Sequence, residues 1–263
     1  MFLKTKFSIL TALSLLAATA LPGSADEIAD KGRPILTRNQ RAVVTMQLVL
    51  KITAGRSSES KAEITGTVVD PSGLTVVSLS SFDPSEMYRR MNEGAKVDID
   101  VEVTDLKILM EDSTEIAAEV VLRDKDLDLA FIRPKSKPAS PMPFVDLTKA
   151  STAQALDQVV TINRLNRAAG RAYAGSVERI SAVIQKPRTF YIPDSNMTAT
   201  TSGSPAFALD GNVLGLFVIR MVGSGGGSSA RDGLTSIILP ADTILKAAKQ
   251  VPEAKPEDST KEK

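Results

Sequence analysis

The stretch that decides how this chain folds is Thr200-Thr201-Ser202-Gly203-Ser204-Pro205-Ala206-Phe207 (TTSGSPAF). A serine between small residues on a tight turn before a strand can present its Oγ, while nearby backbone N–H groups point at one spot where an oxyanion could sit. Directly after it, Asp210-Gly211 separates two apolar runs and predicts a two-residue β-hairpin. Taken alone, the serine turn also fits an ordinary loop rich in serine and threonine.

Outward from this turn, the apolar segments are short and rich in Val, Ile and Thr, which predicts strands rather than helices. The turn Asp70-Pro71-Ser72-Gly73 joins two of them, because proline suits the second position of a type I turn. Two segments that begin with proline, Pro84–Asn92 and Pro240–Lys249, predict short helices. The expected strands are Ala42–Thr53, Ala62–Asp70, Leu74–Leu79, Val97–Val103, Ile116–Arg123, Leu129–Arg133, Val159–Asn163, Ala172–Ile184, Pro205–Leu209, Val213–Val218 and Thr235–Leu239.

The two ends and the middle of the chain show no buried pattern. We expect 26–40 to be a flexible N-terminal segment and 251–263 to be a disordered tail, because both are polar and have little to bury. The proline-rich segment Arg133–Pro143 predicts a semi-extended linker over 134–143. It divides the core into two all-β halves, 41–133 and 144–250.

The first 25 residues are typical of an export signal. Lys4 and Lys6 precede the apolar run Phe7–Leu21, and Pro22-Gly23-Ser24-Ala25 supplies small residues for cleavage before Asp26. The run is short for a membrane span, although an uncleaved N-terminal anchor is the alternative. We therefore predict a periplasmic or secreted protein, with no membrane association after cleavage.

Composition excludes several kinds of chemistry. The 263 residues include no histidine, cysteine or tryptophan, so disulfides, thiol nucleophiles, His/Cys metal sites and imidazole-based proton transfer are impossible. We expect no metal and no cofactor. With 32 Lys and Arg against 31 Asp and Glu, the net charge is +1, and no basic block tracks a phosphate backbone. Nucleic acid is therefore not an expected partner.

Three blocks of sequence occur in the order found in one protein family. The segments Ile64–Ser78, Val120–Ile132 and Thr201–Phe207 resemble the first hairpin, the aspartate-bearing strand and the nucleophile motif of trypsin-like, chymotrypsin-fold serine peptidases, particularly the HtrA-like branch. The resemblance implies an all-β fold of two six-stranded antiparallel β-barrels, at 41–133 and 144–250, with a short C-terminal helix. It also implies a cleft between the barrels.

The resemblance assigns catalytic positions to this chain residue by residue. Ser202 takes the position of the nucleophile, and Asp128 that of the triad aspartate. The family's histidine follows a strand pattern that is Val76-Val77-Ser78-Leu79-Ser80 here, which puts Ser81 at its position. These residues are therefore vestigial triad positions, because a serine hydroxyl cannot accept and return a proton as imidazole does near neutral pH.

The oxyanion-hole region also departs from the family's pattern. It comprises Thr200, Thr201 and Ser202, and the family's glycine two residues before the nucleophile is replaced by Thr200. Glycine tolerates backbone geometry that is costly for a β-branched residue. We therefore expect a misaligned oxyanion hole.

These departures predict an exported pseudoprotease that binds an extended peptide or an envelope protein by β-augmentation. In this interpretation Asp128 is structural and bonded to Ser81 or to nearby backbone N–H groups. One alternative is an active serine endopeptidase with a non-histidine base, but Lys186, the lysine nearest to Ser202 in sequence, lies in a polar segment typical of a solvated loop. Another alternative is a scaffold module with no ligand in the cleft. The sequence leaves the oligomeric state open.

Three further groups of residues have simpler explanations than a site. The alternating residues Asp124, Asp126 and Asp128 resemble the start of a calcium loop. The segment lacks the glycine and the closing glutamate of such a loop. A basic patch between two strands consists of Arg164, Arg167 and Arg171. We predict that these side chains are solvated, and docking of an acidic partner is the alternative. Met87, Tyr88 and Met91 stand at helical spacing, which is typical of residues that pack in a core.

Overall fold

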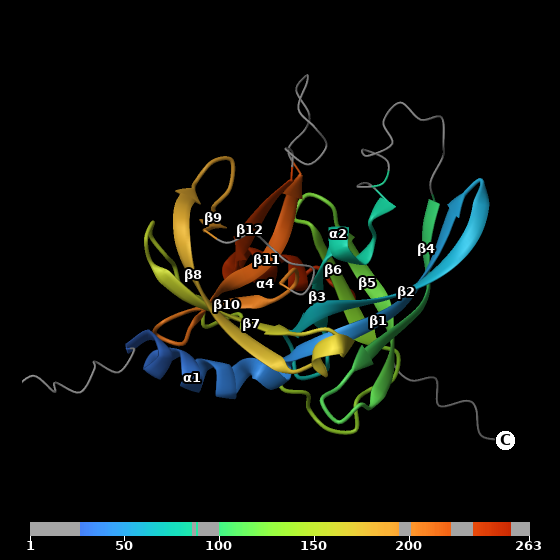
Figure 1. Ribbon diagram of the computed structural model, residues 1–263, viewed down its shortest axis with the longest axis horizontal. Helices are drawn as coiled ribbons and strands as arrows, with labels where there is room; N and C mark the ends of the chain where they lie inside the picture. Colours follow the sequence, from blue (N-terminus) through green and yellow to red (C-terminus); the bar gives the residue numbers. More distant parts are fainter. Residues whose placement is uncertain (1–26, 86–87, 89–99, 195–200, 222–233, 254–263) are drawn as a thin grey trace, which may run out of the picture.

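The protein is built from two closed antiparallel β-barrels of six strands each, which lie side by side (Figure 1). The computed structural model describes residues 27–85, 88, 100–194, 201–221 and 234–253. The strand orders are β1-β2-β3-β6-β5-β4 and β10-β11-β12-β9-β8-β7. The predicted all-β architecture is therefore confirmed, together with the short C-terminal helix α4 (Ala241–Ala248).

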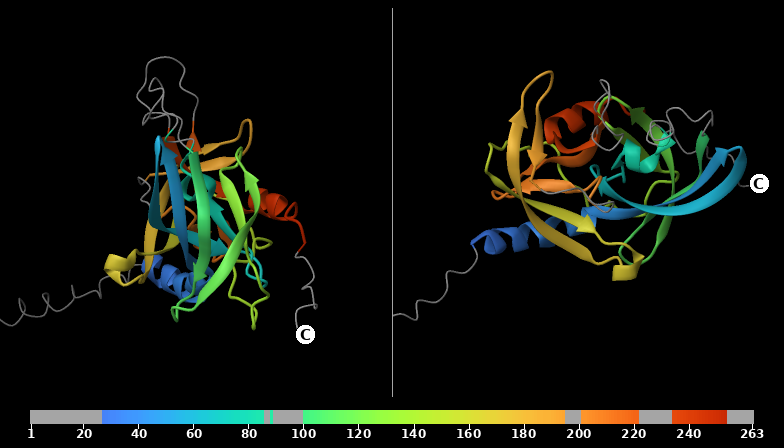
Figure 2. Two further views of the ribbon diagram at one scale, coloured as in Figure 1. Left: turned by 90° about the vertical axis from the view of Figure 1, so that its right-hand side faces the viewer. Right: turned by 45° about the horizontal axis from the view of Figure 1, so that its top comes forward.

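The N-terminal barrel closes around alternating apolar side chains of its first strand. Val44, Met46, Leu48 and Leu50 point into one buried cluster, as the two-residue period of a strand requires. The β1–β2 hairpin turns at Gly55 and reaches well outside the barrel (Figure 2). The six strands are β1 (Val43–Ala54), β2 (Arg56–Val68), β3 (Thr75–Ser78), β4 (Asp100–Leu109), β5 (Glu115–Asp124) and β6 (Leu129–Pro134).

The C-terminal barrel contains one strand that the sequence did not predict. Strand β9 is only four residues long and ends at Pro193, yet Tyr191 pairs with Val183 on one side and with Ile238 on the other. It therefore closes the barrel. The six strands are β7 (Gln158–Arg164), β8 (Tyr173–Ile184), β9 (Phe190–Pro193), β10 (Pro205–Ala208), β11 (Val213–Met221) and β12 (Leu234–Pro240).

The N-terminal segment expected to be flexible is instead helical. Helix α1 (Glu27–Asn39) runs below the barrels and leads through a 3-10 turn, η1 (Gln40–Ala42), into β1 (Figure 1). Ile35 is buried, and Leu36 packs next to Gly175 of β8. The prediction was wrong because it rested on the polar composition of the segment, whereas its apolar residues Ile28, Ala29, Ile35 and Leu36 recur at helical spacing and form the buried or half-buried face of the helix.

The connector between the barrels is also more firmly held than its prolines suggested. Met142 is buried, and its N–H donates to the carbonyl of Pro71 at 3.0 Å. The N–H of Val145 donates to the carbonyl of Val68 at 2.9 Å. The segment after β6 is therefore attached to the N-terminal barrel.

Both predicted turns are present, one with a different length. The N–H of Gly73 donates to the carbonyl of Asp70 at 3.0 Å, as in a type I turn. The second hairpin is confirmed, but its bonds join Ala208 to Asn212 and Gly211 to Ala208, and Gly211 has φ +86°. This is the pattern of a three-residue loop with a bulge rather than a two-residue turn.

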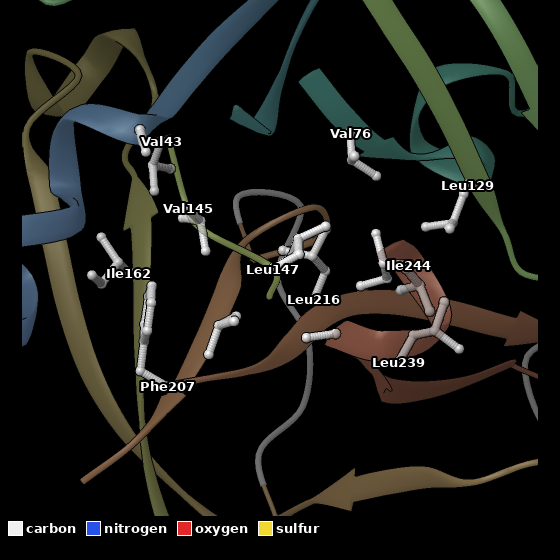
Figure 3. Packing of buried hydrophobic residues seen from close by; sticks show 14 of the residues in the cluster. Val43, Val76, Leu129, Val145, Leu147, Ile162, Phe207, Leu216, Leu239 and Ile244 are labelled. Atoms are coloured by element: carbon white, nitrogen blue, oxygen red, sulfur yellow. The ribbon is translucent and has the colours of Figure 1, made fainter. Parts of the chain in front are cut away.

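A third apolar cluster lies between the barrels, in addition to the cluster inside each of them. Side chains from the first barrel, the connector, the second barrel and helix α4 meet there (Figure 3). Members labelled in the figure are Val43, Val76, Leu129, Val145, Leu147, Ile162, Phe207, Leu216, Leu239 and Ile244. Among the described helices, none is long and apolar enough to cross a lipid bilayer.

Candidate functional site

The predicted triad positions meet where the two barrels face each other. Because β3 pairs with β6, Ser78 lies opposite Leu129. Asp128, the residue just before β6, therefore reaches the first turn of helix α2 (Leu79–Phe82). The carbonyl of Asp128 accepts the N–H of Leu79 at 2.9 Å, which ties the two elements together.

The turn that carries Ser202 is locked against the N-terminal barrel. Gly203 has φ +86°, a conformation that favours glycine, and a Cβ on it would lie 2.3 Å from the carbonyl oxygen of Thr65. Its own carbonyl accepts the hydroxyl of Thr67 at 2.7 Å, and its N–H donates to the carbonyl of Phe217 at 2.8 Å. The described part of this segment, residues 201–204, therefore folds as predicted around a tight turn, and both barrels hold it.

The hydroxyl of Ser202 is bonded to Ser81, the residue that the resemblance predicts for the histidine position. Ser81 Oγ donates to Ser202 Oγ at 2.8 Å, and Ser202 is only 2% exposed. The structure thus brings together the two residues that the resemblance paired, although they are 121 positions apart in sequence. The neighbour of the Ser202 hydroxyl is therefore a second hydroxyl.

The carboxylate of Asp128 accepts four hydrogen bonds, and two of them come from backbone N–H groups, one of the two alternatives expected. Its Oδ1 accepts the N–H and the hydroxyl of Ser80 at 2.7 and 2.6 Å. Its Oδ2 accepts the hydroxyl of Ser78 at 2.6 Å and the N–H of Ile219 at 2.8 Å. A carboxylate offers about four acceptor positions. The expected bonds to backbone N–H groups are present, whereas Ser81 is bonded to Ser202 instead.

Burial raises the pKa of the Asp128 carboxyl above its ordinary value, because desolvation disfavours the charged form. The hydrogen bonds from Ser78, Ser80 and Ile219 act in the opposite direction and favour the carboxylate. The hydrogen bonds of Asp128 are therefore made within the protein, which is typical of a carboxyl group with a structural role. We call Ser78, Ser80, Ser81, Ser202 and Asp128 together the serine corner.

The structure describes two of the three residues predicted for the oxyanion-hole region. Thr201 and Ser202 are both buried, whereas Thr200 lies outside the described residues. Two neighbouring N–H groups serve the fold, since Gly203 donates to Phe217 and Ser204 donates to the carbonyl of Thr201 at 3.0 Å. The expected misalignment therefore stays a prediction.

The arginines predicted to form a solvated patch behave differently from one another. Arg164 is buried and donates to the carbonyls of Leu109 and Met110 in the other barrel at 2.9 and 3.1 Å. Arg171 forms a salt bridge with Glu63 of β2. The solvation prediction was wrong for both, because they join the barrels. Arg167, in the 3-10 turn η2 (Arg167–Ala169), is exposed as expected.

The remaining weak candidates do not form a site in the described part of the chain. No group of three or more carboxylates is arranged there to hold a metal ion. Asp124 Oδ1 instead accepts the N–H groups of Asp126 and Leu127, which shapes the turn before β6. Lys186 is exposed. Met87 and Met91 lie outside the described residues.

A cavity of about 520 Å³ adjoins the serine corner and lies between the two barrels, where a cleft was expected. Ser80 and Asp128 line it, together with apolar side chains from both barrels. The C-terminal barrel contributes Arg188 and Arg220. Sequence reasoning missed these two arginines because they are far apart in the chain and no motif includes them.

Strand β11 has an open edge beside this cavity. It pairs with β12 as far as Met221, whereas its pairing with β10 stops at Leu216. Past that point, no described strand lies on its second side, and Val218, Ile219 and Arg220 line the cavity. Such an edge can pair with an extended segment of another chain.

Two comparisons with known proteins agree with this geometry. The family model of the trypsin-like peptidase domain matches residues 64–216, more than half of the chain. A protein of Arabidopsis thaliana described as "Putative protease Do-like 14" is 25% identical over 195 residues, which make up 72% of this chain and 41% of that protein. The chain thus spans less than half the length of this relative, whose Do-like character agrees with the resemblance to the HtrA-like branch. With its two six-stranded barrels and this family match, the chain belongs to the trypsin-like peptidase family.

Proposed function

We propose that this protein is a pseudoprotease, which binds extended peptide or protein segments in the cleft between its barrels and does not cleave them. One observation carries the proposal: the hydroxyl of Ser202 meets another hydroxyl, that of Ser81, at 2.8 Å. The chain contains no histidine that could take its place.

The missing base removes the central step of the family's chemistry. The base must take the proton of the nucleophile and return it to the leaving amine, which requires a group that titrates near neutral pH. In subtilisin, an unrelated serine protease, loss of the histidine lowers kcat by about 2 × 10⁶. This factor corresponds to roughly 8–9 kcal/mol of transition-state stabilisation. We expect a loss of similar scale here.

Peptide binding does not need the base. An extended segment can pair with the open edge of β11 through backbone groups other than the N–H of Ile219, which already donates to Asp128 Oδ2 at 2.8 Å. The alternate side chains of the segment can enter neighbouring pockets. The cavity beside Ser80, Val218 and Ile219 offers such a pocket. The arrangement therefore supports binding without catalysis.

The experiment that tests inactivity is labelling with a fluorophosphonate probe. We expect the wild type to be labelled no faster than Ser202→Ala, while an active trypsin-like protease serves as positive control. Labelling of Ser202 at the rate of an intact triad, with peptide cleavage that Ser202→Ala abolishes, would establish the alternative of an active endopeptidase with a non-histidine base.

Restoring the triad tests the assignment of positions. We expect Ser81→His alone to give little activity, because all four acceptor positions of Asp128 are occupied and Ser80 holds two of them. Ser80→Ala combined with Ser81→His frees one position for an imidazole N–H. Adding Thr200→Gly tests the oxyanion prediction. Equal labelling of the single and double variants would contradict the role given to Ser80.

Peptide binding is tested by fluorescence anisotropy with a diverse set of labelled extended peptides. We expect saturable binding that competes with unlabelled peptide. Lack of binding across the set, together with envelope proteins that co-purify regardless of cleft substitutions, would favour the scaffold alternative.

We also propose that the protein acts after export, in the periplasm or outside the cell. The N-terminal lysines, apolar run and small residues before Asp26 support this location. Cell fractionation followed by mass spectrometry of the mature N-terminus tests it. We expect a first residue at Asp26, and recovery of the full-length chain from the cytoplasm would contradict the proposal.

A further inference from the structure

The cavity beside the serine corner has an apolar floor. Val218, Ile237 and Leu239 line it from the C-terminal barrel, and Leu79 and Leu127 line it from the N-terminal barrel. Its volume of about 520 Å³ is enough for more than one side chain. An occupant that fills it must therefore present apolar groups.

Two arginines, Arg188 and Arg220, line the cavity from the C-terminal barrel. Among the described residues that line this side, none is a carboxylate. Both arginines are partly buried. Neither forms a salt bridge with a carboxylate of the described residues. We call Arg188, Phe190, Ile219 and Arg220 the arginine wall.

Other contacts position the two guanidinium groups, which have no carboxylate partner in the part of the chain that the structure describes. Arg220 lies over the ring of Phe190, with 4.9 Å between its Cζ and the ring centroid. Arg188 Nη1 donates to the backbone carbonyl of Asp126 at 3.4 Å, a contact that also joins the barrels. A planar guanidinium with free donors matches a carboxylate, to which it can form two parallel hydrogen bonds.

The carboxylates that line the cavity belong to the opposite barrel, and two of them are already used. Asp128 accepts four hydrogen bonds within the serine corner. Asp83 accepts the N–H and the hydroxyl of Ser85. Asp100 and Asp126 are exposed at the N-terminal barrel. Arg123 and Lys125 lie on the same barrel and offset them in charge. Among the described lining residues, the four carboxylates all come from the N-terminal barrel, whereas Arg188 and Arg220 of the four cations come from the C-terminal barrel, so the positive charge faces the cavity from the arginine wall.

The arginine wall coincides with the open edge of β11, since Ile219 and Arg220 belong to both. A peptide paired with this edge would place every second side chain on the same face, next to the cavity. We propose, building on the peptide binding proposed above, that the wall selects extended peptides in which a Glu or Asp side chain flanks an apolar one. The carboxylate binds Arg188 and Arg220, and the apolar side chain fills the floor.

Matched peptide pairs test this selection in fluorescence anisotropy. Each pair shares one extended sequence of about ten residues with a central leucine and differs only in Glu against Gln beside it. We expect the Glu peptide to bind the wild type about tenfold more tightly, as is typical of a charge-assisted pair that is partly shielded from water. The preference should fall as salt increases.

Variants of the full chain assign the preference to the wall. Arg188→Ala and Arg220→Ala should each bring the Glu peptide close to the affinity of the Gln peptide, and Arg220→Lys should keep part of the difference. Arg56→Ala, at the exposed tip of the β1–β2 hairpin, is the matched control and should leave both affinities unchanged. Circular dichroism confirms that each variant is folded.

The outcomes separate this inference from the function on which it rests. Equal binding of both peptides, or a preference that survives both arginine substitutions, overturns the selection by the arginine wall and leaves peptide binding intact. Absence of binding by every peptide overturns the proposed function as well.

Discussion

The serine corner and the arginine wall lie on two sides of one cavity, and their polar groups are used in opposite ways. In the serine corner, Asp128 accepts four hydrogen bonds and Ser202 is bonded to Ser81. In the wall, Arg188 and Arg220 have no carboxylate partner among the described residues. Polar groups whose hydrogen bonds are all made within the protein stabilise the fold, whereas positioned charges without a partner of opposite charge can bind a ligand. The contrast supports binding without catalysis.

The largest effect should come from Gly203→Ala. The added Cβ would lie 2.3 Å from the Thr65 carbonyl, and the residue keeps φ +86°. We expect a loss of about 3 kcal/mol or more of unfolding free energy, or failure to fold. Urea denaturation measures it. The control is Gly55→Ala, which has φ +73° but nothing within 4 Å and should lose only about 1 kcal/mol. Equal losses would contradict a tightly fitted turn.

Asp128→Ala should have the next largest effect. It leaves the N–H groups of Ser80 and Ile219 without their acceptor, and we expect a loss of roughly 2–3 kcal/mol in urea denaturation. Asp126→Ala, two residues away and exposed, is the control and should change stability by less than about 0.5 kcal/mol. Similar losses for the two variants would mean that the serine corner is not held by its carboxylate.

The pH dependence of stability gives a sharper test of the same carboxylate. Burial raises the pKa of Asp128 in the folded state, so between its ordinary value of 3.8 and the raised value the folded protein binds more protons than the unfolded one. Stability from this group is therefore present at low pH and decreases as the pH rises through the window. We therefore expect the unfolding free energy of the wild type, relative to that of Asp128→Asn, to decrease as the pH rises through this range. An increase would mean that the pKa of Asp128 is lowered in the folded state.

The smallest effects should come from the arginine wall. Arg188→Ala should change the unfolding free energy by less than about 0.5 kcal/mol. Arg220→Ala should lose about 0.5–1 kcal/mol, because its stacking on Phe190 is removed. Thermal denaturation of both variants checks this. If either loses as much stability as Asp128→Ala, the arginines serve the fold and the contrast between the two regions fails.

The sequence predicted most of the fold because strand segments, turns and motif order are local features. The serine turn, Asp128 and Ser81 could be assigned from the resemblance, and the structure brings Ser81 to Ser202. Strand β9 was missed because four residues show too little alternation, and α1 because the prediction rested on the polar composition of its segment rather than on the helical spacing of its apolar residues.

Other features of the site depend on which distant residues meet. The partners of Asp128 include Ile219, which is 91 positions away. Arg188 and Arg220 come from a loop and from a strand, and only closure of the second barrel places them beside one cavity. The burial of Arg164 likewise follows from its bonds to carbonyls of the other barrel. No local pattern contains this information.

The apolar cluster between the barrels has a consequence for how the molecule comes apart. Val76 and Leu129 of the first half share it with Ile162 and Leu216 of the second. A fragment that ended after β6 would leave these side chains facing water and would favour aggregation. We therefore expect the two halves to unfold together, and grafting a single barrel onto another protein would require a redesigned contact face.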